Sequence, residues 1–251
     1  METSGIRADE WLSKQFGRPV FQLHVIEPTG AQAAAALAAH VAGQTRAFYY
    51  SKVNVAEVAV LAALTRADMS VVDVNVIFGI DAASVGGDRP VPAEVDIREV
   101  RRGDVDEVLA IAETSFRYTR FHLDPLVSKP IADRIKREWI ASYCTGRRGE
   151  GLWIAMADGH PAAFLAVLGG DDHGRRHKVI DLVAVAPRFQ GRGIGRALVN
   201  FFLAHYAPHC DRLRVGTQIA NVPSAQLYES AGMTIERAQY VLHMHVPESR
   251  G

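Results

Sequence analysis

The chain of 251 residues is poor in cysteine and has no excess of charge of either sign. Its two cysteines, Cys144 and Cys210, are too few for a disulfide scaffold and lack the CxxC spacing of a zinc ribbon, which favours ordinary thiols in a reducing compartment. The 28 basic and 28 acidic side chains give a formal net charge of zero, unlike the positive charge typical of nucleic-acid-binding proteins. An anionic ligand must therefore be bound by a local group of residues.

Long uninterrupted hydrophobic runs are also missing. The first residues lack the basic-then-apolar layout of a signal peptide. The alanine-rich segment 31–43 contains Gln32 and His40 and is too short to cross a bilayer. We therefore expect no membrane anchor and a cytoplasmic location. A hydrophobic content of 48% is enough for one large core or two small ones.

The hydrophobic pattern predicts an α/β chain in two parts. Residues 1–88 form the first part, a compact β-α-β-α-β unit, and residues 89–251 form the second, with the boundary in the glycine- and proline-rich stretch near Ala83 to Ala93. The predicted strands are 20–26, 47–53, 70–78, 95–100, 152–158, 161–169, 178–187, 212–219 and 237–246. The predicted helices are 31–42, 55–67, 105–116, 131–143, 194–207 and 224–231, and an irregular loop covers 117–129.

The stretch QGRGIGRAL, residues 190–198, places Gly191, Gly193 and Gly195 between a predicted strand and a predicted helix. Glycine is among the least stabilising residues in either element, so a special conformation is indicated. A glycine turn that opens directly into a helix exposes unpaired N–H groups at the positive end of the helix, where an anion can bind. The spacing is neither that of a P-loop nor that of a dinucleotide fingerprint.

The pattern Gln190-x-x-Gly193-x-Gly195 resembles the acyl-CoA-binding motif of the GCN5-related N-acetyltransferase (GNAT) superfamily, and TQIANVPSAQLYESAGM, residues 217–233, resembles its closing segment. The resemblance implies a GNAT fold, with a mixed, mostly antiparallel central sheet and flanking helices, preceded by a partial GNAT-like unit. It also implies acetyl-CoA as co-substrate. The implied cofactor-binding residues are Val183, Ala184, Val185, Gln190, Gly191, Arg192, Gly193, Ile194, Gly195, Arg196, Asn221 and Tyr228.

Acetyl transfer to an amine needs a free amine and a protonated leaving thiolate. The resemblance makes Tyr228 the candidate acid. Asp181, on the strand before the glycine loop, is the candidate base, although a strand aspartate can instead pair with an arginine. His177 and Glu113 are weaker candidates, and a water relay would need no dedicated base.

Further segments, WLSKQFGRPVFQLHV and SFRYTRFHLDP, resemble the branch that contains dTDP-fucosamine acetyltransferase, which acetylates a nucleotide-linked amino sugar. An arginine suits a diphosphate and an aromatic ring suits a base. The predicted substrate-binding residues are Arg117, Tyr118, Arg120, Phe121 and His122. Alternative acceptors are a protein N-terminus, an amino acid, a polyamine or an aminoglycoside, and a catalytically silent acyl-CoA-binding module is the alternative from another class.

Histidine pairs occur at His243/His245 and His173/His177, but no third ligand stands at metal-binding spacing, so we expect no metal site. The N-terminal unit lacks a glycine loop and is expected to be structural or a dimerisation element. An exposed sheet edge at residues 240–246 could pair across a two-fold axis to form a homodimer.

Overall fold

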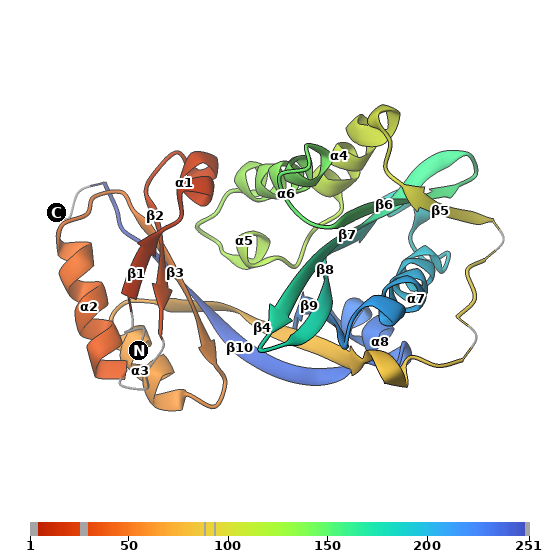
Figure 1. Cartoon of the computed structure of the whole chain (residues 1–251). Coiled ribbons are helices and arrows are strands. Elements are labelled where there is room, and N and C mark those ends of the chain that lie inside the picture. Colours follow the sequence, from red (N-terminus) through yellow and green to blue (C-terminus); the bar gives the residue numbers. More distant parts are fainter. Residues whose placement is uncertain (1–4, 26–29, 88, 93, 249–251) are drawn as a thin grey trace.

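The computed structural model describes residues 5–25, 30–87, 89–92 and 94–248. Within them, ten strands form one sheet (Figure 1). The first half contains β1 (Gly5–Ala8), α1 (Glu10–Phe16), β2 (Val20–His24), α2 (Gly30–Ala42), β3 (Phe48–Asn54), α3 (Val58–Arg66) and β4 (Ser70–Asp81). The second half contains β5 (Val95–Glu99), α4 (Val105–Thr114), α5 (Arg120–Leu123), α6 (Lys129–Cys144), β6 (Gly151–Ala157), β7 (His160–Asp172), β8 (Arg175–Val185), α7 (Ile194–Tyr206), β9 (Arg212–Gln218), α8 (Val222–Ser230) and β10 (Thr234–His245).

The elements predicted from the hydrophobic pattern are present within a few residues of their expected bounds; residue 26 of the first predicted strand lies outside the described residues. The elements missed are β1, α1 and α5, which have only four, seven and four residues. Helix α1 depends on a cap, because Asp9 Oδ1 accepts a hydrogen bond from the Leu12 amide at 2.9 Å. Segments this short carry too little periodicity to be recognised from sequence.

The sheet is mixed, with the strand order β1-β2-β3-β10-β4-β9-β8-β7-β6-β5. Only the β2–β3 and β8–β9 pairs are parallel. The order exchanges strands between the halves of the chain, because β10 lies between β3 and β4, and β4 lies between β10 and β9. The expectation that residues 240–246 form an exposed edge is therefore wrong, and with it the proposed route to a homodimer. The division into residues 1–88 and 89–251 stays a prediction; residue 88 lies outside the described residues.

Helices cover both faces of the sheet in the second half. Helices α4 and α6 lie on one face and α7 and α8 on the other (Figure 1). Strand β7 is consequently buried on both faces, and residues 162–167, AAFLAV, are fully enclosed. Among the described residues, no helix is long and apolar enough to span a membrane.

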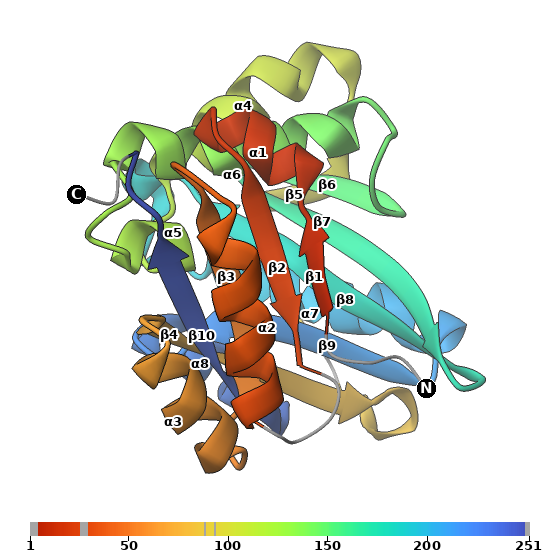
Figure 2. The ribbon, with the colours of Figure 1, turned by 90° about the vertical axis from the view of Figure 1, so that its left-hand side faces the viewer.

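The first half has its own core. Helices α2 and α3 pack against β2, β3 and β10 around Leu37, Tyr49, Leu64 and Leu242 (Figure 2). Strand β3 alternates, so Tyr49 and Val53 belong to this core while Phe48 and Tyr50 join another cluster with α1, α5 and α6. The face of β3 that carries Phe48 and Tyr50 is therefore directed at α5 and α6 of the second half.

Candidate active site

Strands β8 and β9 separate at the centre of the sheet. Their parallel pairing ends at Ile180 opposite Val215, although β8 continues to Val185 and β9 to Gln218. A bulge accompanies the separation, because Ala166 and Val167 of β7 pair with Leu182 and Ile180 and leave Asp181 between them. The segment Val183–Val185 therefore has no partner strand on its β9 side, and its backbone groups there, apart from the Val185 carbonyl, are open to a ligand.

The glycine loop lies at the end of β8 and leads into α7. Gly191 and Gly193 both have φ of +77°, and Gly193 is the N-cap of α7. A Cβ at either position would meet open space, so these glycines are required by backbone conformation and not by packing. Since Gly193 has no side chain to cap the helix, the first amide N–H groups of α7 are available to an anion. Gln190 Nε2 donates a hydrogen bond to the Val185 carbonyl at 3.1 Å and ties the loop to β8.

A cleft of about 750 Å³ joins the separated strands, the glycine loop, the start of α8 and the loop before α5. The predicted site residues that line it are Arg117, Tyr118, Arg120, Phe121, Asp181, Val183, Ala184, Val185, Gln190, Gly191, Gly193, Ile194, Gly195, Asn221 and Tyr228.

Three predicted site residues do not line the cleft. Arg192 forms a two-pronged ion pair with Asp158 in the β6–β7 turn, at 2.6 and 3.1 Å. Arg196 is exposed on α7. His122 is held between Thr119 Oγ1 at 2.6 Å and Asp133 Oδ1 at 3.0 Å, so it joins α5 to α6.

The weaker candidate bases also lie elsewhere. Glu113 is exposed and lies 3.5 Å from Arg137, and His177 lies 3.6 Å from Asp172. Neither residue lines the cleft.

Asp181 lines the cleft, but one of its carboxylate oxygens, Oδ2, is fully engaged. Oδ2 accepts hydrogen bonds from Trp139 Nε1 at 2.9 Å, Tyr143 Oη at 2.7 Å and Arg148 Nε at 2.9 Å. Arg148 also reaches Oδ1 at 3.3 Å. The sequence leaves open that Asp181 pairs with an arginine, and the contacts with Arg148 are of that kind. With three hydrogen bonds, Oδ2 has no capacity left to accept a proton as a base.

Tyr228 lies on α8 at the floor of the cleft. Its side chain is buried, and its ring centroid lies 5.7 Å from that of Phe78. Burial raises the pKa of Tyr228 to about 12, partly offset by a hydrogen bond with Ser224. The hydroxyl therefore stays protonated at neutral pH and can donate a proton.

Three polar cleft residues from the first half of the chain were missed, namely Lys52, Asp73 and Asn75. The strand exchange brings them there, because Val241 of β10 pairs with Lys52 on one side and with Asp73 on the other. Asp73 is only 6% exposed, and neither carboxylate oxygen accepts a hydrogen bond of normal length and angle. Burial raises the pKa of Asp73 to about 6, although weaker hydrogen-bonding contacts with the Val74 amide and the Gln218 side chain, and the charge of Lys52, lower it in part.

Asp124, His243 and His245 bring three potential metal ligands together away from the cleft. Asp124 Oδ2 lies 2.6 Å from His243 Nδ1 and 2.8 Å from His245 Nε2. Arg18, which can only donate, lies 2.7 Å from His245 Nδ1, so the proton of that ring is on Nε2. With its proton on Nε2, His245 donates to Asp124 instead of offering that atom to a metal, and the three side chains form a hydrogen-bonded chain in which only Nε2 of the buried His243 has no hydrogen-bond partner.

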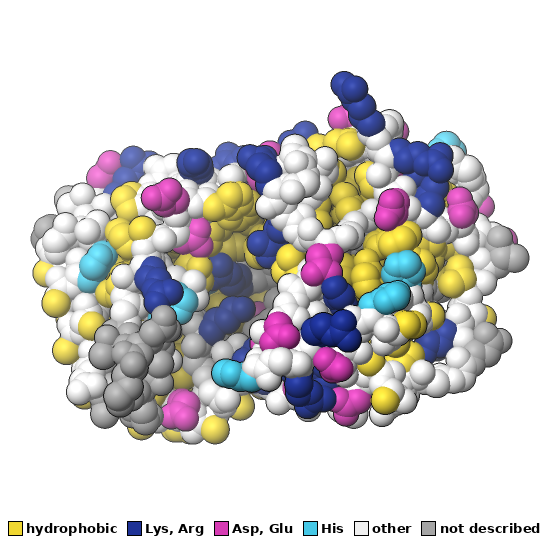
Figure 3. Space-filling model, in the orientation of Figure 1, with side chains coloured by type: hydrophobic (Ala, Val, Ile, Leu, Met, Phe, Trp, Pro, Cys, Tyr) yellow, Lys and Arg dark blue, Asp and Glu magenta, His cyan; other side chains and the backbone are white. Residues whose placement is uncertain are grey.

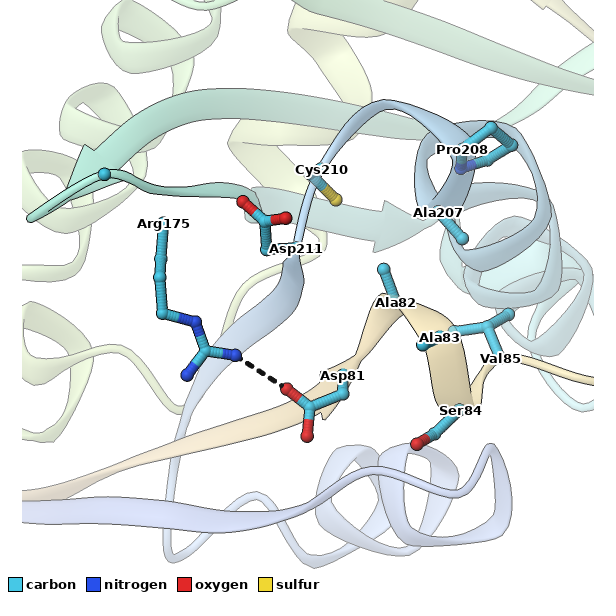
Figure 4. A pocket seen from close by; sticks show the side chains of 11 residues that line it. Asp81, Ala82, Ala83, Ser84, Val85, Arg175, Ala207, Pro208, Cys210 and Asp211 are labelled. Atoms are coloured by element: carbon cyan, nitrogen blue, oxygen red, sulfur yellow. Dashed lines mark hydrogen bonds and ion pairs between the residues drawn. The ribbon is translucent and has the colours of Figure 1, made fainter.

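A second hollow, of about 820 Å³, lies where β4 ends (Figure 4). Its walls are residues 81–85, 174–175, 207–208 and 210–211, and Arg175 reaches across it to Asp81 at 3.0 Å. It contains neither the glycine loop nor the separated strands. The cleft at the glycine loop is therefore the candidate active site.

Comparison with known proteins agrees with this geometry. A relative is the spore coat polysaccharide biosynthesis protein SpsD of Bacillus subtilis (strain 168), 31% identical over 143 residues, which are 57% of this chain and 48% of that protein. The match thus spans about half the length of the relative. Among solved structures, a GCN5-related N-acetyltransferase from Sphaerobacter thermophilus has a TM-score of 0.62 at 13% identity, over 96% of this chain and 76% of that one.

A tandem GNAT protein from the clavulanic acid biosynthesis pathway has a TM-score of 0.59 at 14% identity, over 93% of this chain and 77% of that one. These structures confirm the expected fold class, a mixed sheet with flanking helices. The model of the acetyltransferase (GNAT) family matches residues 107–233, half of the chain. The protein therefore belongs to the acetyltransferase (GNAT) family.

Proposed function

We propose that the protein transfers the acetyl group of acetyl-CoA to the amino group of a nucleotide-linked amino sugar. The observation that carries the acetyl transfer is the separation of β8 from β9 directly beside the glycine start of α7. The free amides of the loop suit a pyrophosphate, and the unpaired edge at Val183–Val185 suits the pantetheine chain. Asn221, at the N-cap of α8, is the proposed contact on the opposite wall.

The proposed reaction uses two groups of opposite character. An alkylammonium has a pKa near ~10.4, so a base must remove its proton before attack. Asp73 takes that role in place of Asp181, because its oxygens accept no hydrogen bond of normal geometry and its pKa of about 6 leaves it ionised at neutral pH. As the C–N bond forms and the C–S bond breaks, the proton of the Tyr228 hydroxyl passes to the thiolate sulfur. The acylated nitrogen releases its second proton, which restores the Tyr228 hydroxyl through solvent in the cleft, and Asp73 returns the first proton to bulk solvent.

No covalent intermediate on the protein is needed. Cys144 and Cys210, the two cysteines, are both absent from the cleft lining. Holding the amine and the thioester together in one cleft can itself lower the barrier by roughly 7 to 11 kcal/mol when the alignment is good.

The sugar acceptor is supported by two independent facts. SpsD is by its name a protein of polysaccharide biosynthesis. The resemblance of the 117–122 loop to the amino-sugar branch agrees with the presence of Arg117, Tyr118, Arg120 and Phe121 on the wall of the cleft. These residues offer charge to a phosphate and rings to a base.

The test is a free-thiol release assay with acetyl-CoA against a panel of amines. The panel contains dTDP-linked 4-amino-dideoxy sugars, amino acids, polyamines and aminoglycosides. Turnover with the nucleotide sugars alone is expected. Turnover with another amine would keep the chemistry and overturn the acceptor, whereas acetyl-CoA binding without turnover would favour a silent acyl-CoA-binding module.

A further inference from the structure

Three cationic side chains meet at the end of the cleft remote from the glycine loop. They are Lys52 of β3, Arg120 of α5 and Lys136 of α6, and all three line the cleft. Figure 3 shows Lys and Arg side chains (dark blue) gathered in the hollow between the two halves of the molecule. For a chain whose formal net charge is zero, this is a strong local excess of positive charge.

These cations have no anionic partner of their own. Across the described ranges, no ion pair within 4 Å includes Lys52, Arg120 or Lys136, and Arg120 Nη1 is buried without a hydrogen-bond partner. The nearby carboxylates do not neutralise the group, because Asp181 is already paired with Arg148 and Asp73 is a single charge against three. Lys136 is only 8% exposed and Arg120 is half-buried, whereas the side chain of Lys52 is exposed at the cleft. An unpaired buried charge such as that of Lys136 is costly to the folded state, so its retention points to a ligand.

Aromatic rings hold two of the cations in place. The guanidinium carbon of Arg120 lies 4.0 Å from the ring centroid of Tyr50 and 4.4 Å from that of Phe121. Lys136 Nζ lies 4.6 Å from the ring of Trp139 and 5.2 Å from that of Phe116. Cation–π contacts of this kind fix a cation without neutralising it.

The aromatic support is itself anchored. The Tyr50 hydroxyl donates to Asp9 Oδ2 at 2.8 Å and approaches Gln22 Oε1 at 3.0 Å. The geometry is thus set before any ligand arrives, which lowers the cost of binding.

The lysines respond to this environment. Burial lowers the pKa of Lys136 to about 8; Asp181 opposes this shift, and the neighbouring Arg120 and Lys52 contribute to it. Desolvation within the cleft lowers the pKa of Lys52 to about 8 as well, with Arg120 and Arg237 as further causes and Asp73 opposing them. A bound anion would relieve the repulsion among these charges.

We propose that Lys52, Arg120 and Lys136 form a binding site for the diphosphate of a nucleoside diphosphate, the part of the acceptor that does not react. The inference rests on the proposed function and specifies its substrate. The planar guanidinium of Arg120 can donate two parallel hydrogen bonds to phosphate oxygens, and the two ammonium groups add charge. The site is distinct from the one for the pyrophosphate of acetyl-CoA, which the glycine loop at the other end of the cleft serves. The same charges repel polycationic acceptors.

The test is calorimetric titration of dTDP into the protein saturated with CoA, so that the glycine loop is already filled. We expect dTDP and inorganic diphosphate to bind and thymidine to show no heat. Lys52→Gln and Lys136→Met should each weaken dTDP about 10- to 100-fold, the usual effect of losing one charged contact. Lys129→Gln is the matched control, since Lys129 lies two turns before Lys136 on α6 and its side chain is 73% exposed.

Absence of dTDP binding to the wild-type CoA complex would overturn the site, and so would equal affinities in Lys52→Gln, Lys136→Met and wild type. These outcomes are separable from the fate of acetyl transfer. Binding of dTDP without turnover of any amine would remove the proposed reaction and keep the diphosphate site, whereas turnover of an amine without dTDP binding would do the reverse.

Discussion

Asp73→Asn should separate activity from stability. The pKa of about 6 leaves Asp73 ionised at pH 7 in a ratio of roughly ten to one, so the wild-type base is already in its active form. The asparagine is nearly the same size but cannot take a proton. We expect kcat/KM for the amine to fall on the order of 10²- to 10⁴-fold, the usual contribution of a general base, with acetyl-CoA affinity unchanged.

The stability of the same variant should move in the opposite direction. The folded-state pKa of Asp73 is raised from 3.8 to about 6, so the folded protein binds this proton more tightly than the unfolded chain. The wild type therefore loses about 2 kcal/mol of stability from this group as the pH rises from 4 to 7. Asp73→Asn has no such loss, and its stability relative to wild type should improve by about 2 kcal/mol over the same range.

Two measurements check this reasoning. Urea unfolding at pH 4, 5, 6 and 7 gives the stability difference, and the pH profile of kcat/KM should show an acid limb near pH 6 in wild type that is lost in the variant. Asp96→Asn, on the exposed part of β5, is the control for both. The role of Asp73 is refuted if the variant keeps wild-type kcat/KM with the same acid limb, or if its relative stability falls as the pH rises, as for a stabilising ion pair.

Three further predictions follow from single positions. Gly193→Val should abolish acetyl-CoA binding by calorimetry while circular dichroism stays unchanged, because valine rarely adopts a φ of +77° although the space around Gly193 is open; unaltered affinity would contradict this. Tyr228→Phe should lower kcat about 10²- to 10⁴-fold without changing acetyl-CoA affinity, and Tyr206→Phe, a buried tyrosine outside the cleft, should not. Burial lowers the pKa of His243 to about 4, so the unfolded chain binds this proton first and stability should fall by about 3 kcal/mol between pH 6.5 and pH 4; His243→Gln should flatten that slope in unfolding experiments.

The glycine loop is the part of the site that could be predicted, because its residues are close together in the sequence. Gln190, Gly193 and Gly195 lie between a strand and a helix, and glycine has a low propensity for both elements. The loop can therefore be recognised without any knowledge of the tertiary structure. The same holds for the long elements, whose hydrophobic periods are regular. The engagement of Asp181 could not be foreseen, since Trp139, Tyr143 and Arg148 reach it from about 40 residues away in the sequence.

Strand β4 shows how a regular pattern can conceal a functional face. Its sequence SVVDVNVIF alternates valines with Asp73 and Asn75, which is typical of a strand with one polar face in solvent. Both polar residues are in fact less than 9% exposed, because β4 pairs with β9 of the second half beside the cleft. The alternation of apolar and polar residues shows which side chains share one face of a strand. It does not show whether solvent or another part of the protein covers that face.

The strand exchange also supports a role for the first half of the chain in the cleft. A purely structural element needs no unpaired charge, yet β3 and β4 bring Lys52 and Asp73 to the cleft, where burial shifts the pKa of each toward its neutral form. Burial lowers the pKa of Arg120 and that of Lys136, from the second half, in the same way. Folded proteins place charged groups without partners mainly at functional sites, where a ligand stabilises them. Here these groups lie together at the end of the cleft opposite the glycine loop. The proposed acceptor site is accordingly built by both halves, and neither half alone holds all the residues that we propose for acetyl transfer.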